Sequence, residues 1–188
     1  MAAGKFPKDV EMLFKKIFKN KEIPSVKPGS RQMRLGYPVM FVYDAKHKAT
    51  LPYWDSLPFS FVLAKYPDGF LGLNLHYLPW TRRIQLGKKL MRRTKNKNRI
   101  TYGDIKSAWQ SAKLPDALLA LTIRRYLYSH IRSNIKIFDF ETYSNAVKDI
   151  RPKFIKDSEK RIFSAIRAKW EMQRRMNQLK KSKRTTPI

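Results

Sequence analysis

Histidines and carboxylates are the side chains of this sequence that could hold a metal ion. The three histidines are dispersed along the chain, at His47, His76 and His130. Because the chain contains no cysteine, a zinc site would need two of these histidines to converge with Asp44 or Asp55. His130 falls on the apolar side of a predicted helix, which is typical of a hydrogen-bonded core histidine. We therefore predict no metal site and no cofactor.

Three aspartates, Asp44, Asp55 and Asp68, could be imagined as the acid cluster of a nuclease. Two-metal chemistry needs carboxylates that converge on one point. Asp68 lies in a predicted turn, whereas Asp44 and Asp55 flank loops, where they can cap backbone amides or pair with Lys46 and Lys48. We find no phosphate-binding loop of the Walker type and no dinucleotide fingerprint. We predict no enzyme and no catalytic residue, with a metal-dependent nucleic-acid-processing enzyme as the alternative.

Positive charge is concentrated between Arg82 and Arg99, a stretch with nine Lys or Arg and no Asp or Glu. The whole chain has 41 basic and 14 acidic residues, a net charge of +27. Such a charge repels itself unless phosphates or carboxylates gather on it. The candidate polyanion-binding residues are Arg82, Arg83, Lys88, Lys89, Arg92, Arg93, Lys95, Lys97 and Arg99, with Arg174 and Arg175 in the last predicted helix. Phosphate contacts position a protein without reading sequence, so we predict sequence-independent binding.

A neutral, aromatic block precedes the basic run. Residues 35–80 hold three basic and three acidic residues and eleven of the 24 aromatic residues. Apolar, β-prone runs at 39–43, 59–63 and 70–78 predict strands, and Tyr66-Pro67-Asp68-Gly69 predicts a hairpin turn between the last two. In the third strand, one face is apolar, and the face of Gly72, Asn74 and His76 is free to meet solvent or a partner. A small antiparallel sheet would bury these aromatic residues, but we favour an SH3-like barrel.

The N-terminal segment 9–21 has the spacing of an amphipathic helix. Its candidate partner-binding residues are Leu13, Phe14, Ile17 and Phe18. The alternatives are that this face docks on the protein's own core or lies on a membrane surface.

The C-terminal half is predicted to be helical. A helix follows Pro79 and runs through Leu90, and Thr101 and Asp104 form a capping box for the next helix. A longer helix is expected over 118–131, and 135–140 is either extended or leads into a helix capped by Asp139. The final helix begins near Asp157. The fold class is therefore α+β, divided into an N-terminal arm (1–34), a β module (35–80), a helical region (81–156) and a basic C-terminal helix with its tail (157–188).

Four segments of the middle block form a series of motifs. They are YDAKHK (43–48), LPYWD (51–55), Leu57-Pro58 and GFLGLNLHYLP (69–79), of which NLHYLP is the most specific. The series resembles virion proteins of large contractile-tailed bacteriophages that are described as DNA end protectors. The likeness covers roughly residues 37–91, and Trp80 stands where a second proline is expected after Pro79. The resemblance implies a structural, non-catalytic role and carries over no catalytic residue.

Together, the residues and the resemblance predict a non-enzymatic bacteriophage virion protein, made in the host cytoplasm, within a multi-subunit assembly. Its expected partners are phage DNA, acidic virion subunits, or both. The alternative is a tail or baseplate subunit that makes only protein–protein contacts. No apolar run has the length of a membrane span and the N-terminus lacks an apolar signal core, so we expect no membrane association and no secretion.

Overall fold

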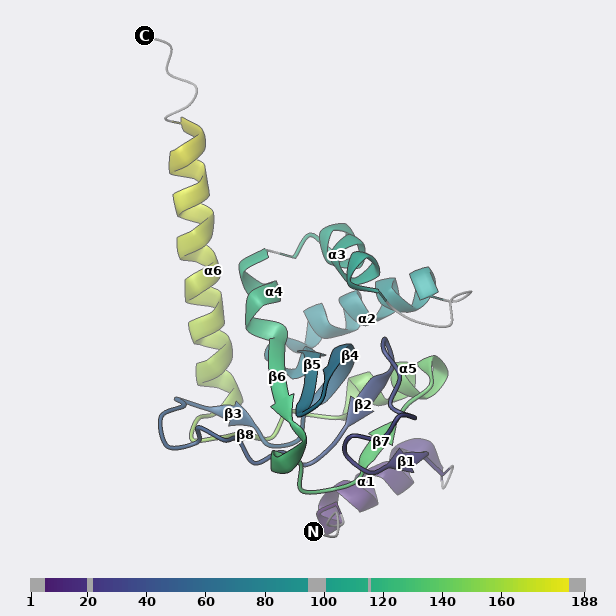
Figure 1. The fold of residues 1–188 in the computed structure, drawn as a ribbon. Coiled ribbons are helices and arrows are strands. Elements are labelled where there is room, and N and C mark those ends of the chain that lie inside the picture. Colours follow the sequence, from purple (N-terminus) through teal and green to yellow (C-terminus); the bar gives the residue numbers. More distant parts are fainter. Residues whose placement is uncertain (1–5, 20–21, 95–100, 115, 183–188) are drawn as a thin grey trace.

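The computed structural model describes residues 6–19, 22–94, 101–114 and 116–182 (Figure 1). The helices are α1 (Lys8–Phe18), α2 (Trp80–Thr94), α3 (Tyr102–Ser111), α4 (Asp116–Thr122), α5 (Phe140–Asp149) and α6 (Glu159–Ser182). The strands are β1 (Ser25–Val26), β2 (Pro38–Met40), β3 (Trp54–Asp55), β4 (Phe59–Tyr66), β5 (Gly69–Asn74), β6 (Ile123–Leu127), β7 (Ile135–Ile137) and β8 (Phe154–Ile155). Within the described residues this confirms an α+β fold with a helix near each end.

The main sheet is antiparallel and has the strand order β1-β7-β2-β4-β5-β6. Because β1 and β6 stand at opposite ends of this order, the sheet is open. Of the two predicted architectures, the small antiparallel sheet is therefore correct and the barrel is wrong. The sheet is also wider than the aromatic block, because β1, β6 and β7 come from outside it. A separate two-stranded sheet joins β3 to β8.

Alternating side chains fill a core on each face of the main sheet. On β2, Met40 belongs to one hydrophobic cluster, whereas Val39, and Phe41 just after the strand, belong to the other. The first cluster lies between the sheet and the helices and includes Trp109, which is completely buried. Among the described residues, the second cluster contains none from an α-helix, and its members come from the strands and the loops. Burial on both faces explains why so many aromatic residues fit into a short sheet.

The predicted hairpin is present between β4 and β5. Tyr66 pairs with Gly69 across the turn, and Gly69 in turn pairs with Leu127 of β6. A Cβ atom at Gly69 would lie 2.0 Å from the carbonyl oxygen of Tyr126. Glycine is therefore required here because two backbones approach closely.

Two predicted helix starts are confirmed. Thr101 accepts a hydrogen bond from the Asp104 amide, and the Asp104 carboxylate accepts one from the Thr101 amide, which completes a capping box for α3. The Asp139 side chain caps α5 by accepting from the Thr142 amide at 2.6 Å. Since β7 ends at Ile137, residues 135–140 are extended first and then lead into the capped helix.

The single helix predicted over 118–131 is wrong. The segment is helical only to Thr122, after which Ile123 to Leu127 pair with β5 as β6. The apolar residues of this segment satisfy the helical period and also suit a strand. Pairing with β5 decides the outcome because it satisfies the backbone of both strands at once.

The prediction that one face of β5 is free is also wrong. Asn74 and His76 are completely buried. The second core covers this face with Phe70 and Tyr126, whose rings lie 5.3 Å apart.

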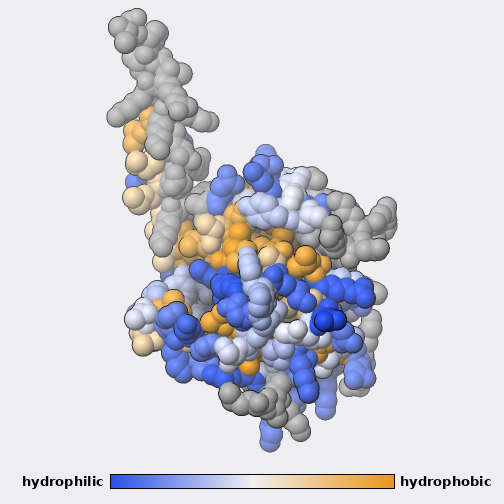
Figure 2. All heavy atoms as spheres, in the orientation of Figure 1, coloured by the Kyte–Doolittle hydropathy of each residue, from blue (hydrophilic) through white to orange (hydrophobic). Residues whose placement is uncertain are grey.

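The helices α2, α3 and α4 lie at one end of the molecule, α1 lies at the other, and α6 extends away from the body (Figure 1). Ile162 and Ile166 anchor the start of α6 in the core. Farther along, Met172, Met176 and Leu179 are 68%, 45% and 57% exposed. On the face drawn in Figure 2, apolar side chains gather around α4, and hydrophilic ones cover the sheet below it.

Candidate nucleic-acid interface

The predicted cationic residues of α2 separate into an exposed group and a buried one. Lys88 is exposed, and Arg82 and Lys89 are half-buried at the surface. Arg83, in contrast, is only 1% exposed. Arg92 and Arg93 belong to the last turns of α2, and Lys95, Lys97 and Arg99 lie outside the described residues. In α6 the structure places Arg174 and an exposed Arg175.

Arg83 points into the protein, so it does not contribute to an exposed basic surface in this conformation. Its Nη1 atom donates to the carbonyl oxygen of Ile150 at 3.0 Å. Burial lowers the pKa of the Arg83 guanidinium, with Glu159 acting in the opposite direction. The direction follows from spacing, because Leu86 and Leu90 lie three and seven positions later and are also completely buried. The charge run therefore overlaps the apolar stripe of α2.

The predicted partner-binding face of α1 is occupied by the protein's own core. Phe14 and Phe18 are buried, with their ring centroids 6.4 and 5.8 Å from that of Phe138. Leu13 and Ile17 are partly buried and pack against the same core. In this structure, α1 therefore docks on the protein's own core, which was one of the predicted alternatives.

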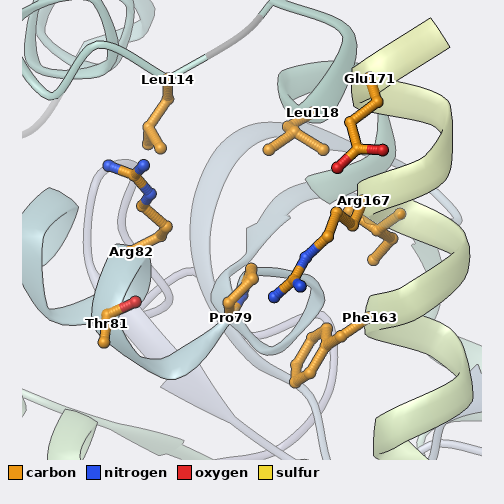
Figure 3. A pocket seen from close by; sticks show the side chains of 9 residues that line it. Pro79, Thr81, Arg82, Leu114, Leu118, Phe163, Arg167 and Glu171 are labelled. Carbon is orange, nitrogen blue, oxygen red and sulfur yellow. The ribbon is translucent and has the colours of Figure 1, made fainter.

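A pocket of about 520 Å³ opens where α2 begins, between α4 and α6 (Figure 3). Its lining residues are Pro79, Thr81, Arg82, Leu114, Leu118, Phe163, Ile166, Arg167 and Glu171. Figure 3 shows Arg82 and Arg167 on opposite sides of the space, Arg82 on α2 with its guanidinium turned toward Leu114 and Arg167 on α6 with its guanidinium turned toward Pro79 and Phe163. Arg82 donates to Gln85 Oε1 at 3.1 Å, and because this acceptor is a neutral amide the charge of Arg82 is not cancelled there.

A second group of cations lies beside β4. Lys65 of β4 donates from Nζ to the carbonyl oxygen of Ser30 at 3.2 Å. This contact brings Lys65 to a loop with exposed Lys27, Arg31 and Arg34. Lys65 is far in the sequence from the other three cations, so no continuous run of basic residues indicated this group.

The three aspartates considered for a nuclease have separate surroundings. Asp44 pairs with Lys48 and Arg132 on the surface, and Asp68 pairs with Arg125. Asp55 is buried with His76. Across the described part of the chain, no three His, Cys, Asp or Glu side chains form a group that could hold a metal ion. Nor does any helix there have the length and apolar character needed to cross a membrane.

Asp55 is the centre of a buried polar network. Its Oδ2 atom accepts from His76 Nδ1 at 2.7 Å and from Asn74 Nδ2 at 2.9 Å. Its Oδ1 atom accepts from the amides of Leu57 at 3.0 Å and Lys153 at 3.3 Å. These bonds tie the β3 segment to the end of β5 and to the approach to β8.

Burial and hydrogen bonding set the charges in this network. Burial alone would raise the pKa of Asp55, but contact with His76 and the donors from Asn74 and Leu57 outweigh it and lower the pKa. Burial lowers the pKa of His76, with Asp55 opposing it. We therefore assign an ionised Asp55 that accepts from the Nδ1–H of a neutral His76. Asn74, which also donates to the Tyr126 hydroxyl at 3.0 Å, extends the network to β6.

Sequence reasoning missed both the network and the pocket. The specificity of the NLHYLP motif was a signal for the network, because Asn74 and His76 belong to it. No sequence motif indicated a role for Arg167, because the pocket that it lines forms only where α2, α4 and α6 meet.

Comparison with known proteins identifies the family. The chain matches the family model described as phage T4 terminal DNA protecting protein over residues 8–172. No curated protein and no solved structure matches the chain. The match spans most of the chain, including the motifs between residues 43 and 79. It therefore confirms the predicted resemblance, and the chain belongs to the phage T4 terminal DNA protecting protein family.

Proposed function

We propose that this protein is a non-enzymatic virion component that binds the phage DNA near its ends without reading its sequence. Membership of a DNA-protecting phage family gives the association with DNA. The observation that carries the proposal is the net charge of +27 on a folded chain. Even if each of the 14 acidic residues cancelled one cation, 27 would still need counterions or phosphates.

Several of the acidic residues are already engaged in local roles within the fold. Asp9 pairs with Lys153, and Asp68 pairs with Arg125. Asp139 caps a helix and Asp55 lies in the interior. The excess positive charge is therefore available to an external polyanion, which fits duplex DNA.

The proposed contact surface, called here the α2–α6 surface, consists of Arg82, Lys88, Lys89, Arg167 and Arg175. Arg82 and Arg167 line the same pocket, so the two helices present their cations on neighbouring parts of the molecule. Lys88 and Arg175 are exposed farther along each helix. This arrangement suits phosphates spaced along a DNA backbone.

The test is the binding of a linear duplex of random sequence over a range of salt concentrations. With 6–10 phosphate contacts, affinity should fall about 10³–10⁵-fold between 50 and 200 mM salt. The double variant Lys88→Glu with Lys89→Glu should bind more weakly and reduce the slope of log K against log salt by about 1.8, which corresponds to two phosphate contacts.

The matched control is Lys15→Glu with Lys16→Glu. These lysines are exposed on α1, at the opposite end of the molecule, and the change in net charge is the same (Figure 1). The control should retain nearly the wild-type salt slope. Equal effects from both pairs would mean that only total charge matters and would reject the α2–α6 surface. No duplex binding at low salt would reject the function itself.

The end of α6 favours a second candidate, contact with another virion subunit. Met172, Met176 and Leu179 are exposed at helical spacing on one side of α6. Residues 172–182 carry four basic and no acidic residues, so two copies side by side would repel each other. The partner that fits is an acidic amphipathic helix.

This candidate can be tested with a labelled acidic amphipathic peptide. Binding that is lost in Met172→Lys with Met176→Lys would support the contact, and binding unchanged by that double substitution would reject it.

A further inference from the structure

The pocket between α2, α4 and α6 has the size and chemistry of a site for one small ligand. Its volume of about 520 Å³ lies within the range of small-molecule pockets, roughly 300–1,000 Å³. Such sites combine apolar walls with a few polar groups that fix orientation. Here the apolar part includes Pro79, Leu118 and Phe163.

The walls fit the flat, apolar face of a nucleobase. Phe163 offers an aromatic ring beside the pocket, and Leu118 faces it from α4 (Figure 3). Stacking on an aromatic ring is available to every base, because each base has a π-face. This tolerance agrees with a protein that does not read sequence.

The α2 side of the same pocket fits a phosphate. Arg82 lines this side, whereas Arg167 lines the opposite side on α6, and a guanidinium binds phosphate with paired hydrogen bonds (Figure 3). Thr81 lies beside Arg82 in the first turn of α2, where backbone N–H groups have no helical acceptor. Glu171 lies on the α6 side, so it repels phosphate there and can accept from an exocyclic amine of a base.

We propose that this pocket binds the terminal nucleotide of a DNA strand, with the base against Phe163 and Leu118 and the phosphate at Arg82, beside the start of α2. The inference rests on the proposed function and adds the place in the fold that would hold the end of a strand. A pocket closed on two sides by helices cannot take a base that is still stacked within a duplex. A terminal nucleotide lacks one stacking neighbour already, so it leaves the duplex at the lowest cost.

The experiment compares two competitors with the same sequence and length: a duplex with open ends and one whose ends are closed by hairpin loops. Each displaces a labelled open-ended duplex from the full-length protein. The wild-type protein should prefer the open-ended competitor by about tenfold, the size of one base–aromatic stack. The preference should disappear in Thr81→Trp, which fills the pocket without changing charge, and in Arg82→Gln with Arg167→Gln.

The matched control is Lys88→Gln with Lys89→Gln, which removes the same charge from exposed or half-buried positions of α2 away from the pocket. It should weaken binding of both competitors and keep the preference. Thermal unfolding and circular dichroism show that each variant is folded. If Thr81→Trp is folded and keeps the preference, the pocket is not the site.

Equal affinity of the wild-type protein for open and closed duplexes would overturn the inference and leave the proposed DNA binding intact. Absence of binding to either duplex would overturn the proposed function, and the inference with it.

Discussion

Replacement of Asp55 by asparagine should destabilise the protein severely, although the two side chains have nearly the same shape. The carboxylate accepts hydrogen bonds from four donors: His76 Nδ1, Asn74 Nδ2 and the amides of Leu57 and Lys153. An asparagine side chain offers one acceptor oxygen in place of two and sets an N–H₂ group against the remaining donors. At least two buried donors therefore lose their acceptor.

The size of the effect follows from this count. Each buried donor left without a partner costs about 1–3 kcal/mol, so the loss for Asp55→Asn should be about 4 kcal/mol. For a chain of this size, 1 kcal/mol changes Tm by roughly 2–4 °C, so Tm should fall by about 8–16 °C. Thermal unfolding by calorimetry and urea unfolding at pH 7 would measure it.

Asp44→Asn is the matched control. Asp44 pairs with Lys48 and Arg132 at the surface, with 32% of its side chain exposed, so the same chemical change should cost about 0–1 kcal/mol. If Asp55→Asn costs no more than Asp44→Asn, the hydrogen bonds to the Asp55 carboxylate do not stabilise the fold.

Two further predictions concern protonation and close packing. Because the pKa of His76 is lowered from 6.5 in the folded state, the unfolded state binds more protons, and the free energy of unfolding measured with urea should fall as the pH drops below about 6.5. The variant His76→Gln should lose the part of this pH dependence that comes from His76. An unchanged pH profile in the variant would contradict the assignment of a neutral His76. Gly69→Ala should cost about 3 kcal/mol or more, since the new Cβ would lie 2.0 Å from the Tyr126 carbonyl oxygen. Gly103→Ala in α3, where the nearest atom would be 3.6 Å away, should instead stabilise by about 0.4–1 kcal/mol, and equal effects of the two substitutions on Tm would refute the packing argument.

Local signals in the sequence predicted the elements that depend on a few neighbouring residues. The turn at Pro67 and Asp68 and the caps at Thr101 and Asp139 appear where the sequence indicates them. Each depends on contacts within about four residues, so the same chemistry acts before and after folding. The prediction failed at β6, where residues with a helical period pair with a strand about fifty positions earlier.

The candidate site shows the same division. The positive charge of α2 was visible as a run, but Arg83 is buried only because the side of α2 that it shares with Leu86 and Leu90 packs on the core, where the Ile150 carbonyl oxygen accepts from it. Arg167 joins Arg82 only because α6 packs beside the start of α2 and α4.

The sequence alone determined the excess of positive charge, the neutral aromatic block and the family motifs, because these are properties of composition and of short segments. The tertiary structure decided which cations face solvent, that Asp55 and His76 meet in the interior, and that a pocket forms between three helices. These outcomes depend on contacts between residues far apart in the chain. Such contacts are fixed only when the whole sheet and its helices pack, since burial and backbone pairing then outweigh local preference.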